Sequence, residues 1–328
     1  MGDNILFYDA AGNTGEFYET RNGLADMIHS NTDWLSTWKL IVSGNFFQTG
    51  YTDLLFYDAP AGTGAFFSAI NGEMSQEAVF PGWRTTWTHI IPGIYRSFPP
   101  SFHPVFLPDL LFYDSSAGLV EVYAGHGGFQ RLTSTTGWRT TWTHIVTGNF
   151  GGKGSTDVLF YDAAAGTGEF YTVNNGALTL LQTVTGWRSD WTHIIRGSFG
   201  GSGTSDLLFY EAASGTGEFY TVNNGSISLI RSNTGWRTSW TSILPGNFST
   251  NQTISQTNLL FYDAAAGVGE FYSVNKGVLN LMQSRSDWRT SWTHIVPGIY
   301  LLVDVPFNAK GGYRGTWSSD DGGAGDDN

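Results

Sequence analysis

Tryptophan and arginine recur together at a regular interval, and this pair offers the clearest ligand-binding chemistry in the chain. Each of five copies is followed by a second tryptophan, four residues after the first. The copies are Trp83-Arg84, Trp138-Arg139, Trp187-Arg188, Trp236-Arg237 and Trp288-Arg289. A sixth tryptophan, Trp34, is followed by Leu35. A flat indole can stack on the apolar face of a sugar ring, and guanidinium and carboxylate groups can bond its hydroxyls, so the motif indicates carbohydrate binding.

Carboxylates recur in step with the tryptophans. One position is occupied by Asp9, Asp58, Asp114, Asp162, Glu211 and Asp263. A second is occupied by Glu16, Glu121, Glu169, Glu218 and Glu270, with Ala65 as the exception. A catalytic site needs an asymmetric set of groups, such as a nucleophile with its base or two carboxylates at a set distance. Near-identical copies suit repeated binding sites better, so we predict that Glu121, Glu169, Glu218 and Glu270 contribute to such sites.

Each tryptophan pair also has a structural interpretation. Large aromatic side chains can fill the space between repeats, and the arginine can pair with the repeated aspartate. We expect the second tryptophan of each pair in the core. For the first tryptophan and its arginine, core packing and ligand binding both stay open.

Histidine marks a further repeated position. It is filled by His89, His144, His193 and His294, with Leu40 and Ser242 in the other two copies. Four histidines around an axis could hold a metal, but they belong to different repeats, and a hydrogen-bonded strand histidine is the simpler interpretation. We therefore predict no metal and no cofactor. Cysteine is absent, which excludes disulfides and zinc–thiolate sites.

The repeat itself indicates the fold. A Phe-Tyr pair occurs at residues 7, 56, 112, 160, 209 and 261, and twelve of the 13 tryptophans follow the same interval. Each unit reads as four short strands, with Asn-Gly turns such as Asn224-Gly225 closing hairpins. The segment from Asp157 to Asp162 is apolar on both faces, so each small sheet must lie between neighbours. Six such sheets predict an all-β, six-bladed β-propeller of four-stranded antiparallel blades.

The chain ends support closure of the ring. The sequence starts inside a unit, at the second strand, and the missing first strand follows Trp292 near the other end. We predict that N- and C-terminal strands pair in one blade. The propeller is expected to be a single domain of residues 1–317. Residues 318–328 form an acidic Gly/Asp tail that is expected to be disordered.

A ten-residue loop before the second strand resembles the FG-GAP/VCBS-type propeller repeat. It reads G-S-F-G-G-S-G-T-S-D at Gly197 to Asp206, with similar versions ending at Asp157 and Asp53. The resemblance implies a propeller related to microbial propeller lectins. The family loop binds calcium through several carboxylates, whereas here Asn149 and glycines stand in their place, which argues against one calcium per blade.

The charge and hydropathy of the chain limit its partners. The net charge is −12, and the 16 Lys and Arg residues are spread along the sequence, so neither nucleic acid nor an anionic membrane is an expected partner. The sequence shows no transmembrane segment and no room for a signal peptide before the first strand, so a cytoplasmic or non-classically released protein is expected.

These observations predict a multivalent lectin without catalysis, with glycans as partners and up to five sites in the grooves between blades. Two alternatives stay open. One is a protein-interaction scaffold that uses the face carrying two inserts, Tyr95 to Pro108 and Ser249 to Thr257. The other is an enzyme with its site at the central channel.

Overall fold

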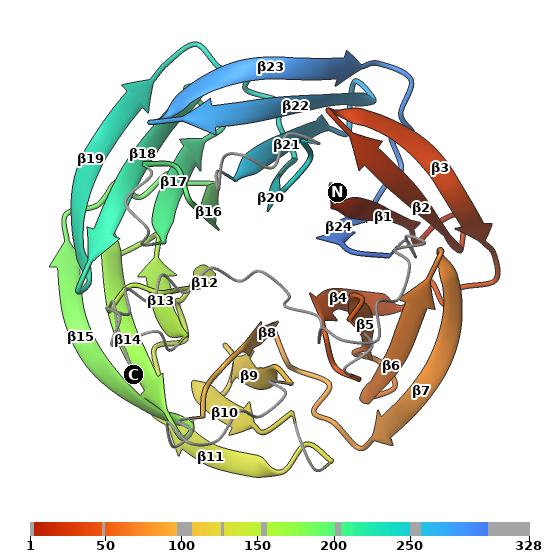
Figure 1. The fold of residues 1–328 in the computed structure, drawn as a ribbon. Coiled ribbons are helices and arrows are strands. Elements are labelled where there is room, and N and C mark those ends of the chain that lie inside the picture. The colour runs from red at the N-terminus through yellow and green to blue at the C-terminus, as the bar shows by residue number, and fades with distance from the viewer. Residues whose placement is uncertain are drawn as a thin grey trace, which may run out of the picture.

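The chain forms a closed ring of six β-sheets (Figure 1). The computed structural model describes residues 3–47, 50–96, 107–125, 128–151, 156–200, 205–249 and 257–300. Within these ranges every regular element is a strand, and each sheet has four antiparallel strands. The predicted all-β, six-bladed propeller is therefore confirmed.

The blades share one plan, in which the strands follow one another from the axis of the ring to its rim. The first three blades contain β24 (His294–Gly298), β1 (Asn4–Asp9), β2 (Thr14–Arg21) and β3 (Leu24–Asn31); β4 (Trp38–Gly44), β5 (Asp53–Asp58), β6 (Thr63–Ile70) and β7 (Glu73–Pro81); and β8 (His89–Gly93), β9 (Asp109–Asp114), β10 (Leu119–Tyr123) and β11 (Arg131–Thr136). The other three contain β12 (His144–Gly148), β13 (Asp157–Asp162), β14 (Thr167–Asn174) and β15 (Ala177–Thr185); β16 (His193–Gly197), β17 (Asp206–Glu211), β18 (Thr216–Asn223) and β19 (Ser226–Asn233); and β20 (Ser242–Gly246), β21 (Asn258–Asp263), β22 (Val268–Asn275) and β23 (Val278–Arg285).

The second strand of each blade is the centre of its core. All six residues of β13 are buried, as are all six of β17. Both faces of these strands are apolar because each sheet packs between two others, as the sequence predicts. The rim strands are half exposed, and β19 alternates between exposed and intermediate positions.

The ring closes through the two ends of the chain. Strand β1 pairs with β24 in antiparallel register, with Asn4 opposite Gly298 and Tyr8 opposite His294. The predicted closure by N- and C-terminal strands is confirmed. It joins the first blade to the last without a disulfide, in a chain that has no cysteine.

Tight turns hold the strands in register. Asn224 and Gly225 both have positive φ, 48° and 76°, as the predicted two-residue hairpin requires. A register shift between Phe219 and Tyr220 marks a bulge against the rim strand β19. Equivalent turns and bulges recur in the β14–β15 and β22–β23 hairpins.

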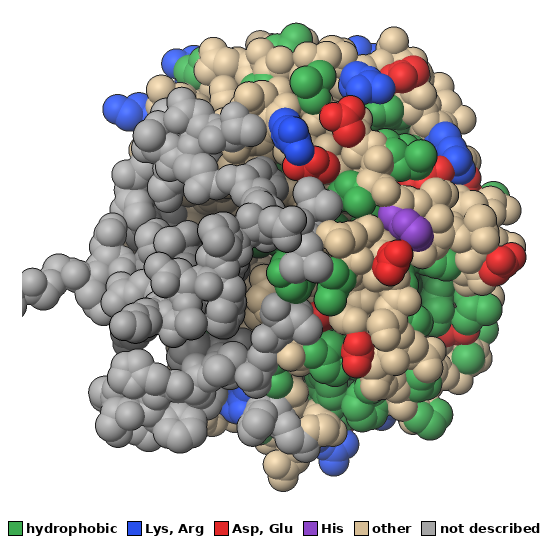
Figure 2. All heavy atoms as spheres, turned by 45° about the vertical axis from the view of Figure 1, so that its right-hand side comes forward, with side chains coloured by type: hydrophobic (Ala, Val, Ile, Leu, Met, Phe, Trp, Pro, Cys, Tyr) green, Lys and Arg blue, Asp and Glu red, His purple; other side chains and the backbone are tan. Residues whose placement is uncertain are grey.

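Several predicted segments lie outside the described residues. They are the acidic tail from Ser318, most of the insert from Tyr95 to Pro108 and most of the insert from Ser249 to Thr257. On the face drawn in Figure 2, acidic and basic side chains are scattered among apolar and polar ones, and neither sign forms a continuous patch over the described residues. No helix long and apolar enough to cross a membrane occurs in the described ranges.

Close packing at Gly217 gives a direct test of this architecture. A Cβ at Gly217 would lie 2.3 Å from Cη2 of Trp236, which is too close for two carbon atoms. We expect Gly217→Ala to lower the free energy of unfolding by about 1–3 kcal/mol, because the strand and the indole must separate. Urea unfolding measures the change. The control is Gly235→Asn, at an open turn position with a φ of 77° that asparagine tolerates; a similar loss there would contradict the packing argument.

Candidate functional site

The first tryptophan of each pair is a wedge between two blades. The amide of Trp187 donates to the carbonyl of Gly166 at 2.9 Å, which fixes the turn that leads from β15 to β16. Its ring packs edge-to-face against Phe209 of the next blade, with the ring centroids 5.1 Å apart. On the other side it fills the space beside Gly168, where a Cβ would lie 2.5 Å from the indole. Trp83, Trp236 and Trp288 make the same pair of contacts.

The second tryptophan is part of the core, as the sequence predicts, in the five copies that carry the arginine, whereas Trp38 of the sixth copy is only partly buried. Trp87, Trp142, Trp191, Trp240 and Trp292 are between 3% and 8% exposed. The guanidinium that follows the first tryptophan lies over the second, for example Arg188 at 4.7 Å from the centroid of Trp191. The same stacking is made by Arg84, Arg139, Arg237 and Arg289. A cation over an indole adds an electrostatic attraction to this packing.

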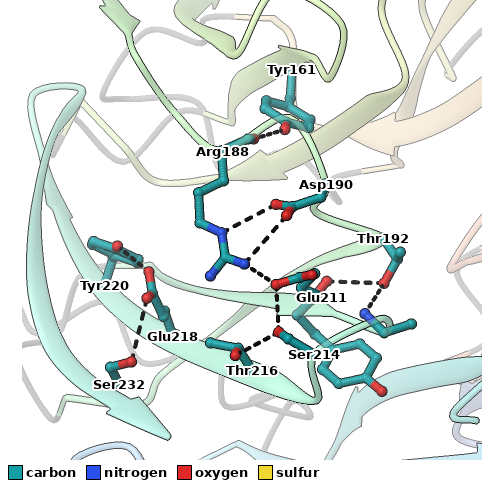
Figure 3. Close-up of polar contacts among 12 residues, drawn as sticks. Tyr161, Arg188, Asp190, Thr192, Glu211, Ser214, Thr216, Glu218, Tyr220 and Ser232 are labelled. Carbon is teal, nitrogen blue, oxygen red and sulfur yellow. Dashed lines mark hydrogen bonds and ion pairs between the residues drawn. The ribbon is translucent and has the colours of Figure 1, made fainter. Parts of the chain in front are cut away.

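Each arginine also reaches carboxylates of the next blade. Figure 3 shows Arg188 between Asp190, at 3.1 Å, and Glu211 of the β16–β19 blade. Arg237 reaches Asp263 at 3.4 Å and Glu270 at 3.3 Å. The other contacts are Arg139 to Asp162 at 3.7 Å and Glu169 at 3.1 Å, Arg289 to Asp9 at 3.9 Å and to Glu16, and Arg84 to Asp114 at 4.0 Å.

The predicted acids are brought to these junctions, but not all of them meet the arginine. Glu218 accepts hydrogen bonds from Tyr220 at 2.5 Å and Ser232 at 3.3 Å (Figure 3). Glu121 is held by Tyr123, Ser134 and Arg131 of its own blade. Only Glu169 and Glu270 of the four predicted acids form an ion pair with a motif arginine within the described residues.

Hydrogen bonding at the junctions stabilises the charged form of the aspartates. Burial alone would raise the pKa of Asp263, but hydrogen bonds from Ser239, Ala266 and Arg237 outweigh it, so this pKa lies below its ordinary value. The pKa of Asp9 is lowered in the same way, against the effect of burial, by hydrogen bonds from Ser291 and Gly12. The polar atoms predicted to bind a ligand are therefore already bonded to one another. These ion pairs and hydrogen bonds hold neighbouring blades together at each junction.

A second set of polar residues lies at the start of the innermost strands, and these strands surround the axis of the ring (Figure 1). We call it the axial ring; its members are Lys39, His89, His144, His193, Ser242 and His294. Most of them bridge to the next innermost strand. Nε2 of His144 bonds the carbonyl of Thr192 at 3.0 Å, and His193 and His294 bond the carbonyls of Thr241 and Lys39 at 3.2 and 3.1 Å. The Lys39 ammonium donates to the carbonyl of Trp87 at 2.9 Å.

His89 differs from the other three histidines. Among the described residues, nothing bonds its Nε2 atom. Its Nδ1 lies 3.1 Å from Oγ1 of Thr88, whose hydroxyl lies 3.0 Å from the carbonyl of Tyr113. Both bonds form together only if Nδ1 carries the proton and the threonine hydroxyl donates to Tyr113. This arrangement leaves the lone pair of Nε2 free.

The electrostatic environment keeps His89 neutral. Burial, the neighbouring His144 and the Lys39 ammonium together lower its pKa to about 4. Burial also lowers the pKa of His144, His193 and His294. The sequence pattern identified the histidine position, but it missed Lys39, which lies beside Leu40 in the one copy without a histidine or serine. Lys39 could have been found from the sequence, because Trp38-Lys39-Leu40 stands where the other copies read Trp-Thr followed by His or Ser.

The first residue of each second strand, an aspartate in four blades and an asparagine in β1 and β21, anchors the loop that follows the innermost strand of its blade. Oδ2 of Asp206 accepts the amides of Phe199 and Gly200 at 2.8 and 2.5 Å, and Oδ2 of Asp53 accepts the amide of Phe47 at 2.8 Å. Asn258 accepts the amide of Phe248 in the same way. Within the described ranges, no three His, Asp or Glu side chains gather in a way that could hold a metal ion.

Comparisons with known proteins give structural neighbours only. No family model and no curated sequence matches the chain. A proposed 6-phosphogluconolactonase from Bacteroides fragilis matches with a TM-score of 0.58 at 9% identity, over 90% of this chain and 98% of its own. A proposed 6-phosphogluconolactonase from Bacteroides uniformis matches at 0.55 and 12%, over 90% and 99%. The periplasmic gluconolactonase of Pseudomonas aeruginosa matches at 0.51 and 11%, over 87% and 80%.

These neighbours correct the functional prediction. They agree with the propeller fold, and at 9–12% identity they show the fold alone. They carry the names of lactonases rather than FG-GAP/VCBS-type lectins, so the prediction of a lectin without catalysis is wrong. The physical reason lies in the junctions, where the Trp187, Arg188 and Glu218 side chains predicted to bind sugar are engaged in packing, ion pairs and hydrogen bonds.

Proposed function

We propose that the chain is a hydrolase that opens a lactone, the internal ester of a sugar acid, at the axial ring. The observation that carries this proposal is the free Nε2 of His89, oriented by Thr88 and accompanied by the Lys39 ammonium. The names of the structural neighbours support lactones as the substrate class. The axial ring favours one asymmetric site, because His89 is the member whose Nε2 is unbonded within the described residues.

The residues present suit ester hydrolysis. Nε2 of His89 takes a proton from water while the water oxygen bonds to the lactone carbonyl carbon. The negative charge that develops on the carbonyl oxygen is stabilised by Lys39, which keeps two N–H donors besides the one on Trp87. When the ring C–O bond breaks, the His89 imidazolium returns its proton to the leaving alkoxide, and a hydroxy acid is released. A histidine with a pKa of about 4 is unprotonated, and so able to act as a base, throughout the neutral range.

Proton release from glucono-1,5-lactone and its 6-phosphate, followed in a pH-stat, tests the proposal. We expect turnover above the uncatalysed rate, and His89→Gln is expected to lower it by about 10²–10⁴-fold, because the base is lost. Lys39→Met is expected to lower turnover by about 10²-fold or more, because the oxyanion loses its cation.

The matched control is His193→Ser, which copies Ser242 at the equivalent position of the next blade. It removes a histidine whose Nε2 is bonded to a backbone carbonyl, so turnover is expected to stay within a few-fold of the parent. Absence of turnover on both lactones, or full activity in His89→Gln, would overturn the proposal.

A further inference from the structure

An open cavity lies between the β16–β19 and β20–β23 blades, far from the axial ring. Its volume is ≈ 350 Å³, and it is lined by Gly200, Thr221, Ile230, Arg231 and Lys276. Ile230 and Arg231 belong to the rim strand β19, and Lys276 lies in the turn between β22 and β23. The cavity is thus at the rim of the ring, whereas the axial ring is formed by the innermost strands (Figure 1).

Two cations face this cavity without a carboxylate partner among the described residues. The motif arginines Arg188, Arg237 and Arg289 are each paired with acids of the next blade. No ion pair involves Arg231 or Lys276 within the described part of the chain. Asp206 lies behind Gly200, and it is fully buried, with Oδ2 accepting the Phe199 and Gly200 amides.

This concentration of positive charge is specific to one junction. Arg231 lies opposite Phe219, and the residues in the same register of the β12–β15 and β20–β23 blades are Gln182 and Gln283. Lys276 has a φ of 48°, as do Asn175 and Asn224 in the same turns of other blades. The corresponding residues of the β2–β3 and β6–β7 hairpins are His29 and Ala78, so this junction combines an arginine and a lysine at two positions that hold glutamine, histidine or alanine and asparagine in the other blades compared.

The turn that carries Lys276 also differs in how it meets its neighbour. In four junctions the turn donates a backbone amide to the carbonyl of the preceding blade's loop aromatic. These bonds are Gly23 to Phe248, Asn71 to Tyr300, Gly176 to Tyr95 and Gly225 to Phe150. Among the described residues, the Gly277 amide forms no such bond with the carbonyl of Phe199. At this junction the turn is held by the Asn233 side chain of β19, whose Nδ2 donates to the carbonyl of Gly277 at 3.2 Å.

We propose that this cavity binds a small dianion of the phosphate-monoester class. Arginine and lysine supply complementary donors, because a guanidinium can bond two phosphate oxygens while an ammonium acts as a compact charge. Ile230 gives an apolar wall against which the organic part of the ligand packs. The site is separate from the lactone site and does not depend on it.

Isothermal titration of the full chain with inorganic phosphate and with glucose 6-phosphate at low ionic strength tests the site. We expect saturable binding of both, with acetate and glucose at least about tenfold weaker, because each lacks the doubly charged group. The double variant Arg231→Gln with Lys276→Asn is expected to lose affinity by at least about tenfold. Its replacements copy Gln182 and Asn224, so the fold is expected to be kept.

The charge-matched control is Arg21→Gln, which removes an exposed arginine that is paired with Glu19. It is expected to leave phosphate binding unchanged. Equal binding by the parent and the double variant, or no saturable binding of either phosphate, would show that the cavity is not an anion site. Lactone turnover measured on the double variant separates the two proposals, since it is expected to be unchanged whether or not phosphate binds.

Discussion

Trp191→Ala is expected to lower the free energy of unfolding by about 3–5 kcal/mol, because truncation of a buried indole leaves a large cavity in the core. The indole is 5% exposed and packs on Phe209 with ring centroids 5.5 Å apart. It also supports the Arg188 guanidinium, 4.7 Å from its ring centroid, which in turn reaches Glu211 of the β16–β19 blade. Truncation therefore also loosens an ion pair at the same junction. Urea unfolding followed by circular dichroism measures the loss.

The control for this change is Leu229→Ala on the rim strand β19. Leu229 is 56% exposed, so its truncation is expected to stay within about 0.5 kcal/mol of the parent. A loss at Trp191 no larger than that at Leu229 would contradict the role of the second tryptophan as core.

The architecture could be predicted from the sequence because the same physical demand is repeated six times. Residues 157–162 are apolar on both faces, which only a sheet between two others can satisfy. Asn224-Gly225 fixes the hairpin, and the missing first strand at the N-terminus requires β24 to complete the blade. The six copies carry the same strand pattern, so a strand that is misassigned in one copy can be corrected from the others.

The site was harder to predict because the function of a repeated polar residue depends on its partner. Arg188 is a residue type that often binds ligands, but its guanidinium forms ion pairs with Asp190 and Glu211 at the junction. Periodicity places Glu121 and Glu169 in equivalent positions, yet Glu121 pairs with Arg131, which has no counterpart in the blade of Glu169. The distinct properties of His89 and Lys39 arise from departures from the repeat, and averaging over copies hides such departures.

Acidification from pH 7 to pH 5 is expected to destabilise the fold, because the axial histidines are held neutral. Burial is the main cause of the lowered pKa of all four, and His89 titrates with a pKa of about 4 compared with 6.5 in an unfolded chain. The unfolded state therefore takes up protons first as the pH falls below 6.5. His89 alone is expected to reduce the free energy of unfolding by about 2 kcal/mol between pH 7 and pH 5.

The pH dependence can be assigned to the axial ring by its range and by mutation. The lowered pKa values of Asp9, Asp114 and Asp263 also destabilise the fold in acid, but their effect begins near pH 4. Asp3 acts in the opposite direction, because burial raises its pKa. Urea unfolding at pH steps from 8 to 4.5 is expected to show a slope that is shallower in His89→Gln. A stability that is constant between pH 7 and pH 5, or an equal slope in the variant, would mean that His89 takes up a proton as readily in the folded ring as in the unfolded chain, which would contradict a His89 held neutral at pH 5.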